Sequence, residues 1–248
     1  MMVCMNEVND ISYLRIEDMG KKDKKEELPE EEAAVLKAVI ESVVGDYMYQ
    51  IISARAIDFT QERLKEIGMT LAEEKDRKVI NQITGRVKSA DSIYKKIRRK
   101  NYPTDKTGVF RCNDLLGVRM VCLFVDDVYE VAKRLKDQPD IHILKEKDYI
   151  RKPKSNGYMS LHLIIKVPVI AQSDISDTDK ETVWRKVEVQ LRTVAMDFWS
   201  VLDHQLVYKK EFPGADSVGK ELKAYAATIW ELDKNMLQLR KKIEHLNI

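Results

Sequence analysis

Apolar residues recur at helical spacing in the part of the chain that follows residue 30. Between Glu30 and Gly68 they succeed one another at intervals of three and four, as on one face of an α-helix. Pro29 and the glutamates after it suit a helix start, because proline fits the first turn and acidic groups favour the positive end of the helix dipole. The pattern predicts one long helix or two consecutive amphipathic helices over 30–68.

Apolar runs of a different kind predict strands in the middle of the chain. Residues 115–125 are almost all apolar, as expected of a buried central strand. The expected strands are 79–84, 115–125, 141–146, 159–169 and 185–193, and the other expected helices are 89–100, 126–136, 194–208 and 217–247. Asp126 would cap the helix that it opens, and the acidic loop 172–181 would join the last two strands as a hairpin-like connection. These elements predict an α+β fold, with a mixed, mainly antiparallel sheet of about five strands flanked by helices and with N- and C-terminal helices.

Two of the expected strands present polar side chains on one face. In 185–193, Val187, Val189 and Leu191 alternate with polar residues, because the side chains of a strand point to opposite faces in turn. The polar face would carry Glu188, Gln190 and Arg192 from this strand and Tyr158, Ser160 and His162 from the start of its neighbour. This face is either a solvent-facing surface of the sheet or the floor of a site. Acid, base and hydroxyl groups on two neighbouring strands favour a site.

A basic segment between Arg86 and Arg111 is the first candidate for binding an anion. It holds nine Lys and Arg against two Asp. Ser92, Lys96 and Arg99 are spaced to share one face of their helix, which suits a polyphosphate. The alternatives are a solvated charged face and a patch that binds an RNA backbone.

Four further residues suggest ligand binding. Arg119 lies inside an otherwise apolar strand, where a cation is costly to bury unless it meets an anion or an aromatic ring. Asp114 precedes the same strand. It is either a turn residue or, paired with Glu188 across the sheet, a ligand of Mg²⁺, which takes one or two carboxylates together with phosphate oxygens. Further along, Gly157 permits close approach to the backbone, and Tyr158 can stack on a base.

Composition narrows the class of protein. Hydrophobic residues make up 44% and charged residues 34% of the 248 residues, which suits a globular protein with a highly charged surface. The net charge of +2 does not by itself indicate binding to nucleic acid. Cys4, Cys112 and Cys122 lack the spacing of metal ligands, so we expect reduced thiols, no zinc and a cytoplasmic location. No window approaches the ~20 apolar residues of a membrane span, and we expect no membrane partner.

Taken in order, several stretches of the chain resemble the stand-alone Rel/Spo synthetase domain, that is, the small alarmone synthetases or GTP pyrophosphokinases. The matching stretches are Gly85–Ser89, Asp114–Arg119, Phe124–Tyr129, Asp148–Ile150, Asn156–His162, Val187–Thr193, Ala195–Trp199 and Asp203–His204. The most specific is Glu-x-Gln-x-Arg-Thr from Glu188, followed by Ala-Met-x-Phe-Trp from Ala195. The resemblance covers about 45–245 and implies a nucleotidyltransferase-like synthetase domain. Its reaction would move the β,γ-pyrophosphate of ATP to the ribose 3′-oxygen of GDP or GTP, giving (p)ppGpp and AMP in stringent-response signalling.

The resemblance also implies roles for individual residues. For ATP, Arg86 and Arg119 would sandwich the adenine, while the phosphates would be held by Lys88, Lys96 and Arg99 with Ser92 on the same helix. The catalytic pair Asp114 and Glu188 would bind Mg²⁺, and Glu188 would also help to remove the 3′-hydroxyl proton. For GDP or GTP, the contacts would be Tyr158 stacked on guanine, Asp197 near the base edge, Lys154 and His162 facing the phosphates, and Gln190 close to the ribose.

Two departures from the family pattern affect the expected substrates and domains. Met159 and Leu161 stand where many small synthetases have Arg and Tyr, which leaves the preference between GDP and GTP open. The long members also carry a metal-dependent hydrolase domain built on a His-Asp pair. None of the four histidines precedes an Asp, so we expect a synthetase without a hydrolase domain.

Apolar positions near the C-terminus follow one another in steps of three and four. They are Leu222, Tyr225, Ile229, Leu232, Met236, Leu239, Ile243 and Leu246, and we call them the seam. Such a pattern packs either on the catalytic domain or on another subunit. We favour a subunit contact and, because relatives assemble as tetramers, expect a homotetramer. The domain plan is a charged tail or linker over 1–30, a synthetase domain with N-terminal helices over 31–212, and a C-terminal oligomerisation helix over 213–248.

Two alternative functions use the same features. A toxin-like enzyme would keep the chemistry and pyrophosphorylate the 3′ end of tRNA. A non-catalytic scaffold would use 86–111 to bind RNA. RNA or an alarmone would also be a suitable allosteric effector of the synthetase.

Overall fold

The computed structural model describes residues 29–171, 181–206 and 214–246, so the expected tail and almost all of the acidic loop lie outside the described residues. The N-terminal apolar pattern forms two helices, α1 (Glu30–Val44) and α2 (Tyr47–Glu74). They separate at Gly45, and the Asp46 side chain caps α2 by accepting a hydrogen bond of 2.7 Å from the Tyr49 N–H. Of the two predicted arrangements, the one with two consecutive helices is confirmed.

Five strands form one sheet: β1 (Ile80–Val87), β2 (Leu116–Cys122), β3 (His142–Asp148), β4 (Leu161–Ala171) and β5 (Glu181–Thr193). Their order is β1-β2-β5-β4-β3, and only the central pair, β2 and β5, runs parallel. β4 and β5 pair antiparallel, as a hairpin connection requires. The predicted α+β fold with a mixed, mainly antiparallel sheet is therefore confirmed.

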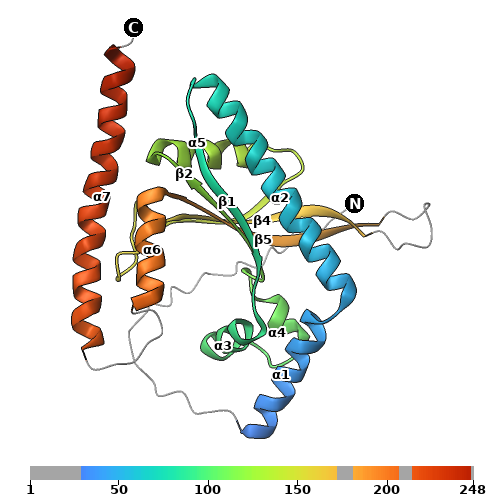
Figure 1. The fold of residues 1–248 in the computed structure, drawn as a ribbon. Helices are drawn as coiled ribbons and strands as arrows, with labels where there is room; N and C mark the ends of the chain where they lie inside the picture. The colour runs from blue at the N-terminus through green and yellow to red at the C-terminus, as the bar shows by residue number, and fades with distance from the viewer. Residues whose placement is uncertain (1–28, 172–180, 207–213, 247–248) are drawn as a thin grey trace, which may run out of the picture.

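The two faces of the sheet differ in the helices that cover them (Figure 1). One face, here called the covered face, packs against α2 and α5 (Val125–Lys136). The alternation predicted for β5 holds there, because Val187, Val189 and Leu191 are fully buried in this core. Buried residues on this face remove apolar surface from water, which is the main favourable term in folding. The opposite face, here called the open face, carries the polar side chains.

A second, smaller core lies beside the first and supports the basic segment. α3 (Ala90–Lys100) and the short α4 (Lys106–Phe110), which the sequence pattern did not predict, pack with α1 around Leu36, Ile93 and Ile97. Ser89 caps α3 by accepting a hydrogen bond from the Ser92 N–H. This core holds one face of the basic helix and leaves its cations for the site.

Most boundaries differ from the prediction by a few residues, and two of these differences change the position of a named residue. β1 continues to Val87, so Arg86 lies on a strand. α5 begins at Val125 with Phe124 in the cap position and no side-chain cap, so the prediction that Asp126 caps this helix is wrong. Asp126 lies in the first turn, and its carboxylate instead accepts two hydrogen bonds from Arg240, of 3.1 and 2.6 Å.

The last two helices are α6 (Val194–Leu206) and α7 (Ala215–Leu246). α7 lies along the side of the domain, packed on α6 and α5 (Figure 1). The Trp199 indole N–H donates to the Leu222 carbonyl at 2.9 Å. On α7 itself, the seam residue Leu222 is buried, whereas Tyr225, Leu232, Met236, Leu239, Ile243 and Leu246 are exposed.

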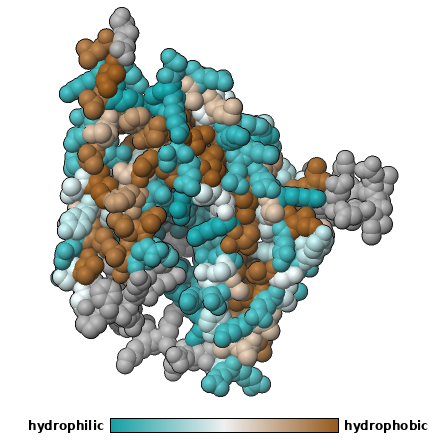
Figure 2. Space-filling view, in the orientation of Figure 1, coloured by the Kyte–Doolittle hydropathy of each residue, from teal (hydrophilic) through white to brown (hydrophobic). Residues whose placement is uncertain are grey.

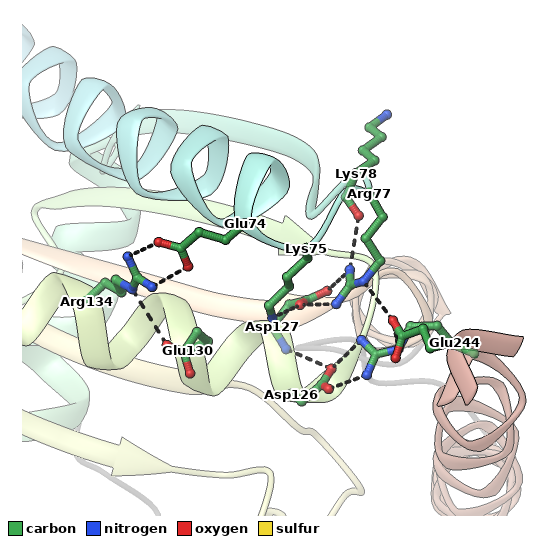
Figure 3. A network of polar contacts seen from close by, with 10 residues as sticks. Glu74, Lys75, Arg77, Lys78, Asp126, Asp127, Glu130, Arg134 and Glu244 are labelled. Carbon is green, nitrogen blue, oxygen red and sulfur yellow. Dashed lines mark hydrogen bonds and ion pairs between the residues drawn. The ribbon is translucent and has the colours of Figure 1, made fainter. Parts of the chain in front are cut away.

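A network of ion pairs holds the far half of α7 against the domain (Figure 3). The buried carboxylate of Asp127 contacts Lys75 and Arg77, each at 2.7 Å. Glu244 of α7 lies 3.5 Å from Arg77. Desolvation alone would raise the pKa of Asp127, but hydrogen bonds from Arg77 and Lys75 hold it below its usual value.

Among the helices of the described ranges, none combines the length and apolar composition that a membrane crossing requires.

Candidate active site

The candidate site lies on the open face, where β2 and β5 run side by side. The parallel register places Glu188 opposite Gly117 and Gln190 opposite Arg119. A cavity of about 160 Å³ opens here between β1, β2 and β5, and its lining includes Thr84, Arg86, Gly117, Arg119 and Gln190. Since Gly117 has no side chain, the strand leaves space beside Glu188.

Glu188 is the acidic centre of this face. Its Oε1 lies 3.2 Å from Nδ1 of His162, and its Oε2 accepts a hydrogen bond of 2.8 Å from the Gln190 amide. Burial alone would raise the pKa of Glu188, but the contacts with His162 and Gln190 outweigh it and hold the pKa below its usual value. Burial lowers the pKa of His162 despite the nearby carboxylate. The pair is therefore an ionised carboxylate beside a neutral imidazole.

Asp114 is the second acid, and two lysines hold it. Lys88 lies 3.0 Å from one carboxylate oxygen, and Lys96 of α3 lies 2.7 Å from the other. Although burial favours the neutral acid, these lysines, Lys96 foremost, keep the pKa of Asp114 below its usual value. The negative charge of Asp114 acts on Glu188 by raising its pKa, which shows that the two carboxylates lie within electrostatic reach.

The donor set around these acids fits one kind of metal. Among the described residues, no group of three or more His, Cys, Asp and Glu side chains is placed to hold a metal ion. Two ionised carboxylates suit Mg²⁺, which commonly takes only one or two protein carboxylates and completes its shell with water and phosphate oxygens. The lysines beside Asp114 would serve the same phosphates.

Beyond His162, the site continues into a cluster of aromatic and cationic side chains, here called the aromatic cluster. The Lys154 ammonium lies 4.4 Å from the ring centre of Tyr158 and 4.6 Å from that of Tyr149. The Tyr158 hydroxyl is 2.8 Å from Nε2 of His162. Gly157 precedes this tyrosine with φ +93°, and a Cβ added there would lie 2.6 Å from Cβ of Ala226 on α7. The turn therefore requires glycine both for its backbone and for its contact with α7.

Two arginines meet one carboxylate between the cavity and the aromatic cluster. Oδ1 of Asp197 lies 3.3 Å from Nη1 of Arg119 and 3.3 Å from Nη1 of Arg192. Arg119 comes from β2, Arg192 from β5 and Asp197 from the first turn of α6. The Arg119 side chain is 32% exposed, so it is less buried than its apolar strand predicted, and the anion that it meets is a residue of this chain.

The structure brings together most of the residues predicted for the site. They are Arg86, Lys88, Lys96, Asp114 and Arg119 on one side, and Lys154, Tyr158, His162, Glu188, Gln190 and Asp197 on the other. Ser92 and Arg99 are less central. The Ser92 hydroxyl accepts a hydrogen bond from Ser89 at the start of α3, and Arg99 is exposed in its last turn. Their proposed contact with phosphates stays a prediction.

Three residues have environments that the pattern did not reveal. Arg192 belongs to the predicted polar face but is 1% exposed, and Tyr149 packs edge-on against both Tyr158 and His162. The sequence signals were Arg192 itself, a cation on an alternating strand, and Tyr149, an aromatic residue directly after β3. Met159 is buried in the core of the covered face. The replacement of the family's arginine by methionine at this position therefore leaves no gap in the open face.

Comparisons with known proteins agree on one family. A model of the region found in RelA / SpoT proteins matches residues 85–212. GTP pyrophosphokinase YwaC of Bacillus subtilis is 40% identical over 166 residues, which are 66% of this chain and 76% of that protein. GTP pyrophosphokinase YjbM of the same organism is 32% identical over 190 residues, 77% of this chain and 86% of that protein. The structure of small alarmone synthetase 1 from Bacillus subtilis bound to its product pppGpp has a TM-score of 0.66 and 31% identity, covering 79% of this chain and 96% of that one.

Proposed function

The chain belongs to the RelA/SpoT family, and from this membership we propose that it is a GTP pyrophosphokinase that transfers the pyrophosphate of ATP to the ribose 3′-oxygen of GDP or GTP. The products would be AMP and a guanosine 3′-pyrophosphate, the alarmone of the stringent response. None of the four histidines in these 248 residues precedes an Asp, so the sequence carries no His-Asp pair of the hydrolase type.

ATP would occupy the side of the site that holds most of the cations. Arg86 and Arg119 line the cavity beside β2, where two guanidinium planes suit an adenine ring between them. Lys88 and Lys96 lie next to Asp114, where they would contact the phosphates of ATP. Phosphoryl transfer depends mainly on positioning and on neutralising charge, and this cluster supplies both.

The acceptor would bind at the aromatic cluster. The Tyr158 ring suits stacking on guanine, and Lys154 lies beside it where an acceptor phosphate would be bound. His162 and Gln190 contact Glu188 and would lie next to the ribose. Asp197 would accept hydrogen bonds from the edge of the base.

In the reaction, the acceptor 3′-oxygen attacks the β-phosphorus of ATP. The new P–O bond forms as the bond between the β-phosphorus and the α,β-bridging oxygen breaks, and AMP leaves with that oxygen. Mg²⁺ held by Asp114 and Glu188 would neutralise the phosphate charge. Glu188, which is ionised and lies two residues before Gln190 on the same face of β5, would receive the hydroxyl proton.

The observation that carries this proposal is the pair of ionised carboxylates, Asp114 and Glu188, on one sheet face together with a cationic cavity and the aromatic cluster. The test is incubation of the purified chain with γ-labelled ATP, Mg²⁺ and either GDP, GTP or uncharged tRNA, followed by thin-layer separation. We expect a labelled guanosine product and equimolar AMP. Label transferred to tRNA alone would contradict the guanine acceptor.

A matched pair of variants tests the metal and catalytic role. Glu188→Gln keeps the shape of the side chain but removes its charge, and turnover should fall by about 100-fold or more. The control is Glu231→Gln in the surface ion pair with Lys234, which should leave turnover unchanged. Near-normal turnover of Glu188→Gln would show that this carboxylate is not needed.

We also propose that the exposed part of the seam on α7 is where copies of the chain meet in a homotetramer. Tyr225, Leu232, Met236, Leu239, Ile243 and Leu246 are 45–83% exposed. Figure 2 shows hydrophobic residues gathered along the α7 side of the molecule. Monomeric proteins seldom expose a contiguous apolar patch of this kind. For location we propose the cytoplasm, where ATP and guanine nucleotides are available and where Cys112 and Cys122 stay free thiols.

A further inference from the structure

Arg192 is a buried cation on the open face to which no substrate role has been assigned above. Its side chain is 2% exposed, and it lies among three polar partners. Nη2 donates to Oε1 of Gln190 at 2.6 Å and to the Tyr158 hydroxyl at 3.1 Å, while Nη1 donates to Asp197 at 3.3 Å. A guanidinium has donors and no acceptor, so each of these partners must accept.

The contact with Gln190 determines which way its amide points. The amide has one accepting oxygen and one donating NH₂ group. With the oxygen turned to Arg192, the NH₂ group is left to donate to Oε2 of Glu188 at 2.8 Å. A flipped amide would place its NH₂ group against the guanidinium and its oxygen against the carboxylate, which are two repulsive contacts.

The contact with Tyr158 determines the direction of a second series of hydrogen bonds. The hydroxyl has a single proton, and because its oxygen accepts from Arg192, that proton is available for Nε2 of His162 at 2.8 Å. A ring nitrogen that accepts carries no proton, so the proton of the neutral imidazole is on Nδ1. From there it donates to Oε1 of Glu188 at 3.2 Å.

We propose that Arg192 is a positioning residue whose guanidinium sets the direction of both series of hydrogen bonds, so that each oxygen of Glu188 receives one donor. The two series start at a single side chain and end on the two oxygens of a single carboxylate. Glu188 is thereby held in one orientation, and the Nδ1–H tautomer of His162 is selected. The consequence for the reaction rests on the function proposed above, but the hydrogen-bond directions do not.

The alternative is that Arg192 only stabilises the fold through its ion pair with Asp197. The two views differ in the tautomer of His162. The first measurement is therefore the ¹⁵N spectrum of histidine-labelled protein without nucleotides, at a pH where the imidazole is neutral, with the His162 signal assigned by its loss in His162→Gln. The Nδ1–H tautomer is expected in the wild type, and an Nε2–H tautomer would overturn the proposal.

Two variants of Arg192 and one matched control extend this test. Arg192→Met removes the donors and should convert His162 to a mixture of tautomers or to the Nε2–H form. Arg192→Lys keeps a donor and should retain part of the Nδ1–H population. Arg185→Met removes an arginine from the same strand but from the covered face, where it contacts the Trp184 carbonyl, and should leave the tautomer unchanged. An unchanged Nδ1–H tautomer in folded Arg192→Met would overturn the proposal.

Kinetics then connect positioning to the reaction. Misorientation of Glu188 should lower kcat of Arg192→Met by between about 10- and 100-fold, with partial recovery in Arg192→Lys and an unchanged KM for ATP. A loss of activity that follows only the fraction of folded protein in thermal unfolding would overturn the positioning role. A wild-type chain that forms no AMP would instead contradict the proposed function, and the tautomer would still be read.

Discussion

The carboxylate of Asp197 lies 3.3 Å from the guanidinium of Arg119, so that a side chain of α6 contacts a side chain of β2 across the open face. By the proposed roles, Arg119 belongs to the adenine and Asp197 to the guanine edge. The two substrates would therefore bind on either side of one ion pair.

Asp197→Asn should weaken binding of the guanine nucleotide. The amide offers one acceptor instead of a charged pair, and loss of a charge-assisted hydrogen bond corresponds to an increase in the acceptor KM of about 10- to 100-fold. The KM for ATP should change by less than about threefold, because Arg119 keeps its place in the strand. Initial rates at varied GDP, GTP and ATP give both constants, and an unchanged acceptor KM would contradict the role of Asp197.

Gly157→Ala should destabilise the turn that carries Tyr158. The new methyl would meet Ala226 at 2.6 Å in a backbone with φ +93°, which costs about 1–3 kcal/mol of unfolding free energy. The KM for the acceptor should rise as Tyr158 shifts. Denaturant unfolding and kinetics check both effects. The control is Gly219→Ala in α7, where nothing lies within 4 Å of the added methyl and stability should stay the same or increase slightly.

Low pH should break the ion pairs that join Asp127 of α5 to Lys75 and Arg77, the residues that follow α2. The pKa of Asp127 is lower in the folded chain than in the unfolded one, so its stabilising contribution is complete above the unfolded pKa of about 3.9 and is lost as the pH falls through the folded value. Asp127→Asn should cost about 3 kcal/mol at neutral pH, since it leaves Lys75 and Arg77 without their shared anion.

The measurement for Asp127 is the free energy of unfolding in urea at several pH values. The difference between wild type and Asp127→Asn should shrink as the pH falls below about 4. Glu231→Gln, in an exposed pair, should show no more than about 1 kcal/mol at any pH. A difference for Asp127→Asn that does not depend on pH would contradict the assigned ion pairs.

Charge placed on the exposed part of the seam should separate the subunits. Leu232 is 54% and Ile243 50% exposed, so Leu232→Glu with Ile243→Glu costs the monomer little but would bury two charges in an interface. Light scattering should then give the mass of one chain, 28.8 kDa, and a larger mass for the wild type and for Lys241→Glu. A wild-type monomer at micromolar concentration would rule out the tetramer.

Local patterns predicted the sheet and most of the site because strand alternation is a local property. The residues Val187 and Glu188 fall on opposite faces as soon as the strand forms, whatever it pairs with. The resemblance then predicted Asp114 as the partner of Glu188 in binding Mg²⁺, which alternation alone does not reveal. Helix spacing likewise predicted α7 and its seam.

What the sequence did not reveal depends on contacts between distant segments. Arg192 is buried because α6 and the loop at Tyr158 close over it. Gln190 and Asp197 lie close to it in sequence, but Tyr158 lies 34 positions earlier. Leu222 follows the seam spacing, yet Trp199 and α6 cover it. Asp126 suits a helix cap by its residue type, but Arg240, more than a hundred positions later, binds its carboxylate.

The close approach of Gly157 to Ala226 also bears on how short a recombinant fragment of this enzyme can be. The matched family region ends at 212, whereas the turn at Gly157 and Tyr158 packs against α7, which begins at Ala215. A recombinant fragment trimmed to the family match would retain every residue assigned to the two substrates and lose the surface on which the Tyr158 turn rests. A fragment for engineering or inhibitor screening therefore has to extend past the C-terminal boundary of the family match to include α7, just as it has to begin before residue 85 to include α2 on the covered face.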